Sequence, residues 1–348
     1  MALSKYLSLA WFLALATCAC SSGSEDGEPL EPPEPPGQPF GLVKGADVSW
    51  LSEMEAAKIK FYNNVGEEKD LLEILKGKGM NTIRLRVWVN PQDGWCDVND
   101  VVEKARRAKR AGFRTLIDFH YSDSWADPGK QTKPALWQNK DISALKALVS
   151  SHTTEVLAAL KNHGVTPEWV QIGNETNNGM LWEDGKASVS MKSFAELILS
   201  GYNAVKATSP DIKVIVHLSN GYDNSMFRWM FDGLKANGAK WDVVGMSLYP
   251  RASDWQRKNE QCLANMQDMI TRYDKEVLLC EVGMPMSEGA AAKAFITDLI
   301  AKVKSLPENK GLGVLYWEPQ AYNSWKGYKL GAFDDSGKPT EALDAFIN

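Results

Sequence analysis

Two short segments of the sequence each end an apolar run in a glutamate. Trp169–Gly173 has the composition of a buried strand, and Asn174 and Glu175 follow it directly. Val277–Cys280 is a second such run and is followed by Glu281. A single carboxylate in this position is usually a loop residue or an ion-pair partner. Two at the carboxyl ends of strands of one barrel can face each other across a sugar: one protonates the leaving oxygen, and the other stays ionised opposite the anomeric carbon.

The separation of the two carboxyl groups would decide the stereochemistry. About 5–5.5 Å allows a covalent intermediate and retention, whereas about 6.5–9.5 Å leaves room for a water molecule and inversion. Inward-pointing glutamates on two strands lying well apart around one barrel mouth are expected to meet at the shorter distance.

The elements that must position these glutamates alternate along the chain. Eight strand-like runs are predicted at Leu42–Val48, Thr82–Trp88, Arg114–Phe119, Trp169–Gly173, Lys213–Leu218, Val243–Leu248, Glu276–Cys280 and Gly313–Trp317. Helical periodicity predicts helices at Glu67–Lys76, Val98–Arg110, Ile142–Asn162, Lys192–Thr208, Ser225–Ala236, Asp254–Asp274, Ala290–Val303 and Glu341–Ile347. Such alternation predicts a single (β/α)8 TIM barrel over residues 41–348. A doubly wound open sheet is the alternative, but no glycine-rich phosphate turn follows the first strand.

Polar, charged and aromatic residues gather at the predicted carboxyl ends of these strands, where barrels of this class carry their chemistry. Among them, Asp47 ends the first strand and is a candidate substrate-binding residue. Arg84 could keep Glu281 ionised by direct pairing, Tyr249 could donate a hydrogen bond to it, and Asn174 could bind a sugar 2-hydroxyl. The chain has four histidines and none at metal-ligand spacing, so no catalytic metal site is predicted.

Composition limits the classes of partner. The 348-residue chain has a net charge of −5 and a pI near 5.6, so it lacks the basic footprint of a nucleic-acid-binding protein. Thirteen tryptophans are consistent with stacking on sugar rings, although each one alone could equally be a core residue. Cys96, Cys262 and Cys280 allow one disulfide without specifying it.

The amino-terminal segment has the pattern of an export signal. Lys5 precedes the apolar run Tyr6–Ala16, and small residues precede Cys20. We therefore expect a lipoprotein signal peptide at residues 1–19 and lipidation of Cys20, with Cys18 as the alternative acceptor and a plain cleaved secretory peptide as the alternative signal. A disordered Pro/Glu-rich tether at residues 20–40 would follow. The expected location is the cell surface of a Gram-negative bacterium, with a lipid anchor in the outer membrane as the only membrane contact.

Several motifs together resemble a known family. They are Lys44–Ser49, Arg84–Pro91, Asp118–Pro128, Ile172–Glu175 and Tyr316–Pro319. Their order and spacing, from about Gly41 to the carboxyl terminus, resemble glycoside hydrolase family 53, the endo-β-1,4-galactanases that act on type I arabinogalactan side chains of pectin.

The resemblance implies a retaining hydrolase with Glu175 as acid/base and Glu281 as nucleophile. It assigns supporting positions to Arg84, Asn174, Tyr249 and Trp317, and sugar contacts to Asp118, His120, Trp125 and His217. It implies no required cofactor. A structural calcium ion stays open, because the chain departs from the family pattern at Val282–Pro285 and is short at Gln320–Leu330, where some relatives bind calcium.

The expected partner is β-1,4-galactan and the expected state is a monomer. Two alternatives remain open at the level of sequence: a β-mannanase or β-glucanase of the same clan, and a non-catalytic surface lipoprotein that only binds glycans.

Overall fold

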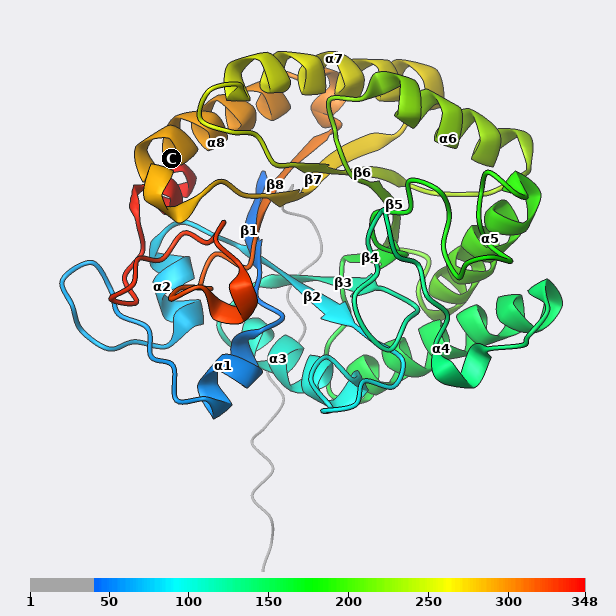
Figure 1. Cartoon of the computed structure of the whole chain (residues 1–348), viewed down its shortest axis with the longest axis horizontal. Coiled ribbons are helices and arrows are strands. Elements are labelled where there is room, and N and C mark those ends of the chain that lie inside the picture. The colour runs from blue at the N-terminus through cyan, green and yellow to red at the C-terminus, as the bar shows by residue number, and fades with distance from the viewer. Residues whose placement is uncertain (1–40, 348) are drawn as a thin grey trace, which may run out of the picture. The chain divides into compact units, whose positions relative to one another are not determined.

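Eight parallel strands close into one barrel, as the sequence predicted. The computed structural model describes residues 41–347 (Figure 1). Each strand pairs with the next along the chain, and the last pairs with the first. The strands are β1 Val43–Asp47, β2 Thr82–Val87, β3 Arg114–Phe119, β4 Trp169–Ile172, β5 Lys213–Leu218, β6 Val243–Leu248, β7 Glu276–Val282 and β8 Gly311–Trp317. The chain is therefore a (β/α)8 TIM barrel.

The helices form a ring around this barrel (Figure 1). They are α1 Leu51–Ala56, α2 Leu71–Gly77, α3 Val98–Arg110, α4 Ile142–Asn162, α5 Met191–Thr208, α6 Asn224–Ala236, α7 Trp255–Tyr273 and α8 Gly289–Lys304. Short 3₁₀ segments are η1 Ala135–Trp137, η2 Met286–Glu288, η3 Pro307–Asn309, η4 Trp325–Gly327 and η5 Glu341–Phe346.

Two helix predictions need correction. The helix predicted at Glu67–Lys76 begins only at Leu71, because the Asp70 side chain accepts a hydrogen bond from the Leu72 amide and caps α2 there. The helix predicted at Glu341–Ile347 is the 3₁₀ segment η5, which packs on α8 and has no side-chain cap. Short terminal turns commonly adopt the 3₁₀ geometry.

The barrel interior is layered, because side chains alternate along each strand. Its lower part is an apolar cluster that includes Leu116 of β3, Trp169 of β4 and Ile215 of β5. Two residues further along, on the same faces of β3 and β5, lie the buried polar side chains Asp118 and His217. A polar layer therefore lies above an apolar one, directly below the barrel mouth.

A β-bulge in β7 directs Glu281 into that mouth. Met246 of β6 pairs with Leu279, but the next residue, Ser247, pairs with Glu281, so Cys280 has no partner on β6. Cys280 belongs to the inner apolar cluster. In a regular strand the following residue would point to the opposite face; the extra residue of the bulge turns Glu281 inward as well.

The cysteines of the barrel form no disulfide with one another. Cys96, Cys262 and Cys280 are buried free thiols, so the possible disulfide does not form among them. Residues 41–347 contain no group of three or more His, Cys, Asp or Glu side chains that could hold a metal ion. The signal peptide, Cys18, Cys20 and the tether lie outside the described residues.

No helix between Gly41 and Ile347 has the length and apolar character needed to cross a lipid bilayer.

Candidate active site

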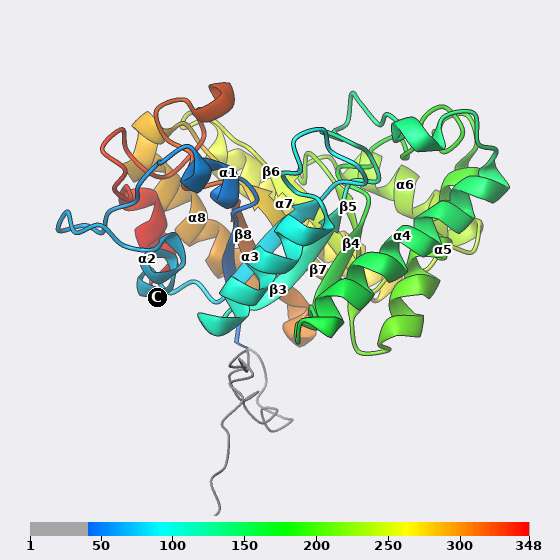
Figure 2. The same cartoon turned by 90° about the horizontal axis from the view of Figure 1, so that it is seen from below.

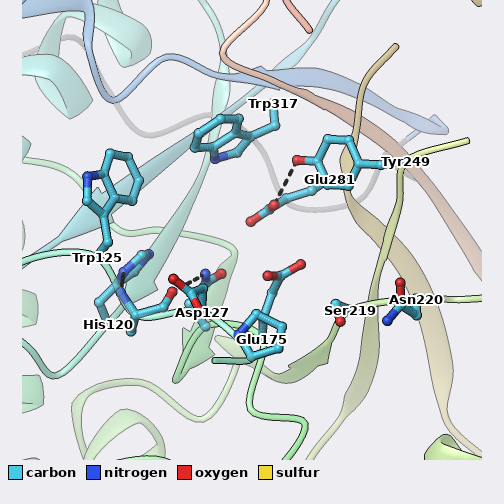
Figure 3. A pocket seen from close by; sticks show the side chains of 12 residues that line it. His120, Trp125, Asp127, Glu175, Ser219, Asn220, Tyr249, Glu281 and Trp317 are labelled. Carbon is cyan, nitrogen blue, oxygen red and sulfur yellow. Dashed lines mark hydrogen bonds between the residues drawn. The ribbon is translucent and has the colours of Figure 1, made fainter. Parts of the chain in front are cut away.

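A cavity of about 430 Å³ opens at the carboxyl ends of the strands. Figure 3 shows Glu175 and Glu281 pointing into it from opposite sides, with Tyr249 beside Glu281. Of the eleven residues predicted for the site, seven line its wall: His120, Trp125, Asn174, Glu175, Tyr249, Glu281 and Trp317. The other four, Asp47, Arg84, Asp118 and His217, are buried below it rather than exposed in the wall.

A sharp turn after β4 presents Glu175. Gly173 has φ +81°, and a Cβ there would lie 2.5 Å from Cγ2 of Thr176, so only glycine fits. Glu175 itself has φ +44°, a left-handed conformation that is uncommon for a non-glycine residue and that clusters at functional sites. The turn lifts Glu175 out of the strand and into the cavity.

Glu281 is held by two donors, both anticipated from the sequence. Arg84 Nη2 lies 2.9 Å from Glu281 Oε1, and the Tyr249 hydroxyl donates to Oε2 at 2.9 Å. Both contacts favour the ionised carboxylate. Burial and the negative charge of Glu281 raise the pKa of Tyr249 well above its ordinary value, so the hydroxyl keeps the proton it donates.

Arg84 organises the layer below the cavity. Its guanidinium also contacts Asp47 at 2.7 Å and Asp118 at 2.9 Å, and it donates to Asn174 Oδ1 at 3.0 Å. The Asn174 amide nitrogen donates to the carbonyl of Ala126 at 2.9 Å, which fixes the orientation of the amide. One amide hydrogen of Asn174 remains to be donated into the cavity.

Glu175 is supported by a chain of hydrogen bonds through Ser247 and His217. The Ser247 hydroxyl donates to Glu175 Oε1 at 2.7 Å and lies 2.8 Å from His217 Nε2. Because the hydroxyl proton is used on Glu175, His217 must carry its proton on Nε2 and donate it to Ser247. Nδ1 is then an acceptor for the Gln171 amide at 3.1 Å. Burial lowers the pKa of His217 well below its ordinary value, which keeps the ring neutral.

The two glutamates differ in which form their surroundings favour. Burial raises the pKa of Glu175 and of Glu281, and at Glu281 the charge of Glu175 adds to the rise while Arg84 opposes it. Two buried carboxylates that raise each other's pKa titrate as a pair, and the pair retains one proton to higher pH than either group would alone. Glu281 has the Arg84 ion pair and the Tyr249 hydroxyl, whereas within residues 41–347 the Glu175 carboxylate accepts a hydrogen bond from Ser247 alone. The shared proton is therefore more stable on Glu175.

Aromatic side chains form one side of the cavity. Trp125 and Trp317 line it with ring centroids 5.8 Å apart, and Trp50 packs edge-on against both. Arg86, fully buried, lies 4.1 Å from the ring centroid of Trp125 and pairs with Glu318 at 3.3 Å. Such stacked cations hold an aromatic ring in a fixed plane.

His120, at the base of this side, has a fixed tautomer. Its Nδ1 accepts from the Ala126 amide at 3.1 Å, so Nε2 carries the proton and donates to Asp118 at 3.0 Å. Burial lowers the pKa of His120, and the ring is therefore a neutral, rigid part of the wall.

Sequence reasoning missed several residues of the site. Asp127, Ser219 and Asn220 line the cavity, and Ser247 contacts Glu175 directly. Three of these residues lie at or just after the end of a predicted strand: Ser219, Asn220 and Ser247. That position could have indicated a place in the site.

The comparisons with known proteins agree with this geometry. The model of glycosyl hydrolase family 53 matches residues 43–294 and 287–346. A probable arabinogalactan endo-β-1,4-galactanase A from Neosartorya fischeri is 35% identical over 298 residues, covering 79% of this chain and 83% of the relative. An arabinogalactan endo-β-1,4-galactanase from Thermothelomyces thermophilus is 32% identical over 332 residues, covering 87% and 98%.

One solved structure is similar over most of its length. A chain from a study of two fungal β-1,4-galactanases superposes with a TM-score of 0.81 at 31% identity, and the match covers 88% of this chain and 99% of that one. With the family model matched along nearly the whole barrel, the chain belongs to glycosyl hydrolase family 53 and is a glycoside hydrolase.

Proposed function

We propose that this glycoside hydrolase cleaves internal β-1,4-galactosidic bonds in the type I arabinogalactan side chains of pectin and releases galacto-oligosaccharides. The observation that carries the proposal is the facing pair Glu175 and Glu281 in one cavity, with their surroundings favouring opposite protonation states. The two relatives whose names state arabinogalactan endo-β-1,4-galactanase activity support galactan as the substrate.

The reaction proceeds by two displacements with overall retention. Glu281 attacks the anomeric carbon while Glu175 gives its proton to the departing glycosidic oxygen, which leaves as a hydroxyl group. The sugar is then an ester of Glu281. Glu175, now ionised, removes a proton from water; the oxygen of that water attacks the same carbon, and the carboxylate of Glu281 departs.

The residues below the cavity act by positioning. Arg84 keeps Glu281 ionised in spite of the nearby Glu175. Ion pairs with Asp47 and Asp118 fix the position of the Arg84 guanidinium. Asn174 presents an amide hydrogen to the 2-hydroxyl of the sugar that reacts. Trp125 and Trp317 offer flat faces to neighbouring sugar rings, in line with their place in the wall.

Replacing the nucleophile tests the proposal. We expect Glu281→Ala to abolish turnover of β-1,4-galactan with the fold retained, and azide to restore cleavage in Glu281→Gly by forming a glycosyl azide in place of the ester. Glu68→Gly, at an exposed residue lining a separate surface cavity, is the matched control and is expected to keep full activity. Full activity of Glu281→Ala would overturn the assignment.

A polysaccharide panel tests the sugar. Reducing ends are expected to rise with galactan and not with mannan or β-glucan. Cleavage of mannan or glucan alone would change the substrate within the clan, and binding without any rise in reducing ends would make the chain a glycan-binding protein.

We also propose export and anchoring. Residues 1–19 act as a lipoprotein signal, Cys20 carries the lipid, and residues 20–40 link a monomeric enzyme to the outer membrane, outside the cell. The small residues before Cys20 and the Pro/Glu-rich composition after it support this. Metabolic labelling with a fatty acid is expected to be lost in Cys20→Ser and kept in Cys18→Ser; the reverse result would move the lipid to Cys18.

A further inference from the structure

The face of the barrel opposite the cavity carries a set of exposed cations. They share one location, the carboxyl ends of helices and the loops that lead back into strands, at the end where the described chain enters β1 (Figure 2). We call this set the basic face; it consists of Lys109, Arg110, Lys161, Lys235, Lys240 and Lys304.

Most of these cations form no ion pair within residues 41–347. Of the six, only Arg110 forms an ion pair with another residue of 41–347, and it is a long one to Glu103 at 3.7 Å. Among the exposed carboxylates at this end of the barrel, Asp274 and Glu308 both bind Lys310 at 2.5 Å, which partly neutralises them. Asp211, between α5 and β5, is also exposed and forms no ion pair with another residue of 41–347. Lys5, Glu25, Asp26, Glu28, Glu31 and Glu34 account for −4 of the chain's net charge of −5, so residues 41–348 carry a net charge of −1. The positive charge of the basic face is therefore balanced by an excess of carboxylates elsewhere on the barrel.

Helix dipoles account for only part of this arrangement. A cation in the last turn of a helix is favoured by the partial negative charge there, and five of the six residues occupy such turns. Lys240 lies outside any helix, between α6 and β6. Together with Lys235 and Lys275 it borders another surface cavity, of about 240 Å³, which makes this part of the basic face concave as well as positive.

We propose that the basic face docks on an anionic phospholipid surface and thereby turns the cavity that contains Glu175 and Glu281 away from that surface. Gly41, the first described residue, lies on the docking side, two residues before β1 begins at Val43. Each lysine that lies near anionic headgroups increases the affinity of a protein for the membrane by about fivefold. The same surface repels the negative remainder of the chain, so attraction and repulsion favour one orientation.

Vesicle binding tests the proposal without reference to catalysis. Residues 41–347 contain the closed barrel and both of its apolar clusters, so a chain of residues 41–348 is suitable. We expect it to bind phosphatidylcholine vesicles only when they contain phosphatidylglycerol, and salt to weaken the binding. Reversing two charges with Lys161→Glu and Lys240→Glu should weaken binding by at least ~25-fold.

The matched control reverses two exposed lysines in loops at the cavity end, with Lys140→Glu and Lys329→Glu. It changes the net charge equally and should alter vesicle binding by less than about threefold, well below the loss expected for two lysines on the docking face. Both double variants should hydrolyse galactan like the parent. The proposal would be overturned if both double variants lost vesicle binding equally, or if the parent showed no preference for anionic vesicles. If the parent bound soluble polygalacturonate more tightly than vesicles, the partner of the basic face would be an acidic polysaccharide instead of a lipid.

Discussion

Removing the hydroxyl of Ser247 should shift the pH range in which the enzyme works. Ser247 donates to Glu175 Oε1 at 2.7 Å, and this bond favours the ionised carboxylate. A hydrogen bond to a charged group contributes about 1.5–3 kcal/mol, and part of it is kept when the carboxyl group is protonated. A difference of about 1.4 kcal/mol between the two forms corresponds to about one pKa unit.

Ser247→Ala removes the hydroxyl that donates to the ionised Glu175 carboxylate. Without it, the pKa of Glu175 rises, Glu175 stays protonated to higher pH, and the basic limb of kcat/KM against pH should move up by about one unit in Ser247→Ala. The assay is the release of reducing ends from galactan at low substrate concentration over a range of pH. A basic limb that stays in place or moves to lower pH would refute this account of Glu175.

Ser219→Ala is the matched control, since Ser219 lines the same cavity and its hydroxyl contacts Asn177 rather than Glu175. Its basic limb should coincide with that of the parent. Ser247→Ala also leaves the buried Nε2–H of His217 without an acceptor, which should lower the free energy of unfolding by about 1–3 kcal/mol. Urea titration measures that loss.

Three other changes have definite expected outcomes. Tyr249→Phe removes a donor from Glu281, so the pKa of Glu281 should rise and the acidic limb of kcat/KM should move up by about one unit while the basic limb stays; movement of the basic limb would contradict this. Gly173→Ala should lower the free energy of unfolding by more than about 1 kcal/mol, because φ is +81° and the new Cβ meets the side chain of Thr176; an unchanged thermal midpoint would contradict it. Burial lowers the pKa of His152 from 6.5 to about 4, so the unfolded chain binds an extra proton between these values and stability falls as pH drops through that range. His152→Phe should abolish about 3 kcal/mol of this dependence in urea titrations at pH 7 and pH 4, and an unaltered dependence would contradict the cause.

The architecture could be predicted from sequence because local composition encodes it. Apolar runs such as Lys213–Leu218 and Val243–Leu248 coincide with β5 and β6 residue for residue, and a polar cluster after each run marks the catalytic rim. Both glutamates were located in this way: Glu281 directly follows an apolar run, and Glu175 is separated from one by Asn174 alone.

The inner layering could not be predicted from the same signals. Asp47, Arg84 and Asp118 look like rim residues in the sequence, but side-chain alternation places them one layer below the cavity, where they contact each other instead of solvent. The bulge that turns Glu281 inward depends on the register between β6 and β7, which involves residues far apart in the chain. The contact between Ser247 and Glu175, 72 residues apart, depends on closure of the whole barrel.

The most direct measurement of the central claim is to trap the reaction at its intermediate. A galactobiosyl fluoride with fluorine at the 2-position should inactivate the enzyme, because the first displacement is driven by a good leaving group and the second is slowed. Mass spectrometry of the digested protein is expected to place one sugar adduct on the peptide that contains Glu281, with none on the peptide of Glu175. An adduct on Glu175, or galactan cleavage that first yields the inverted anomer, would contradict the division of roles between the two carboxylates.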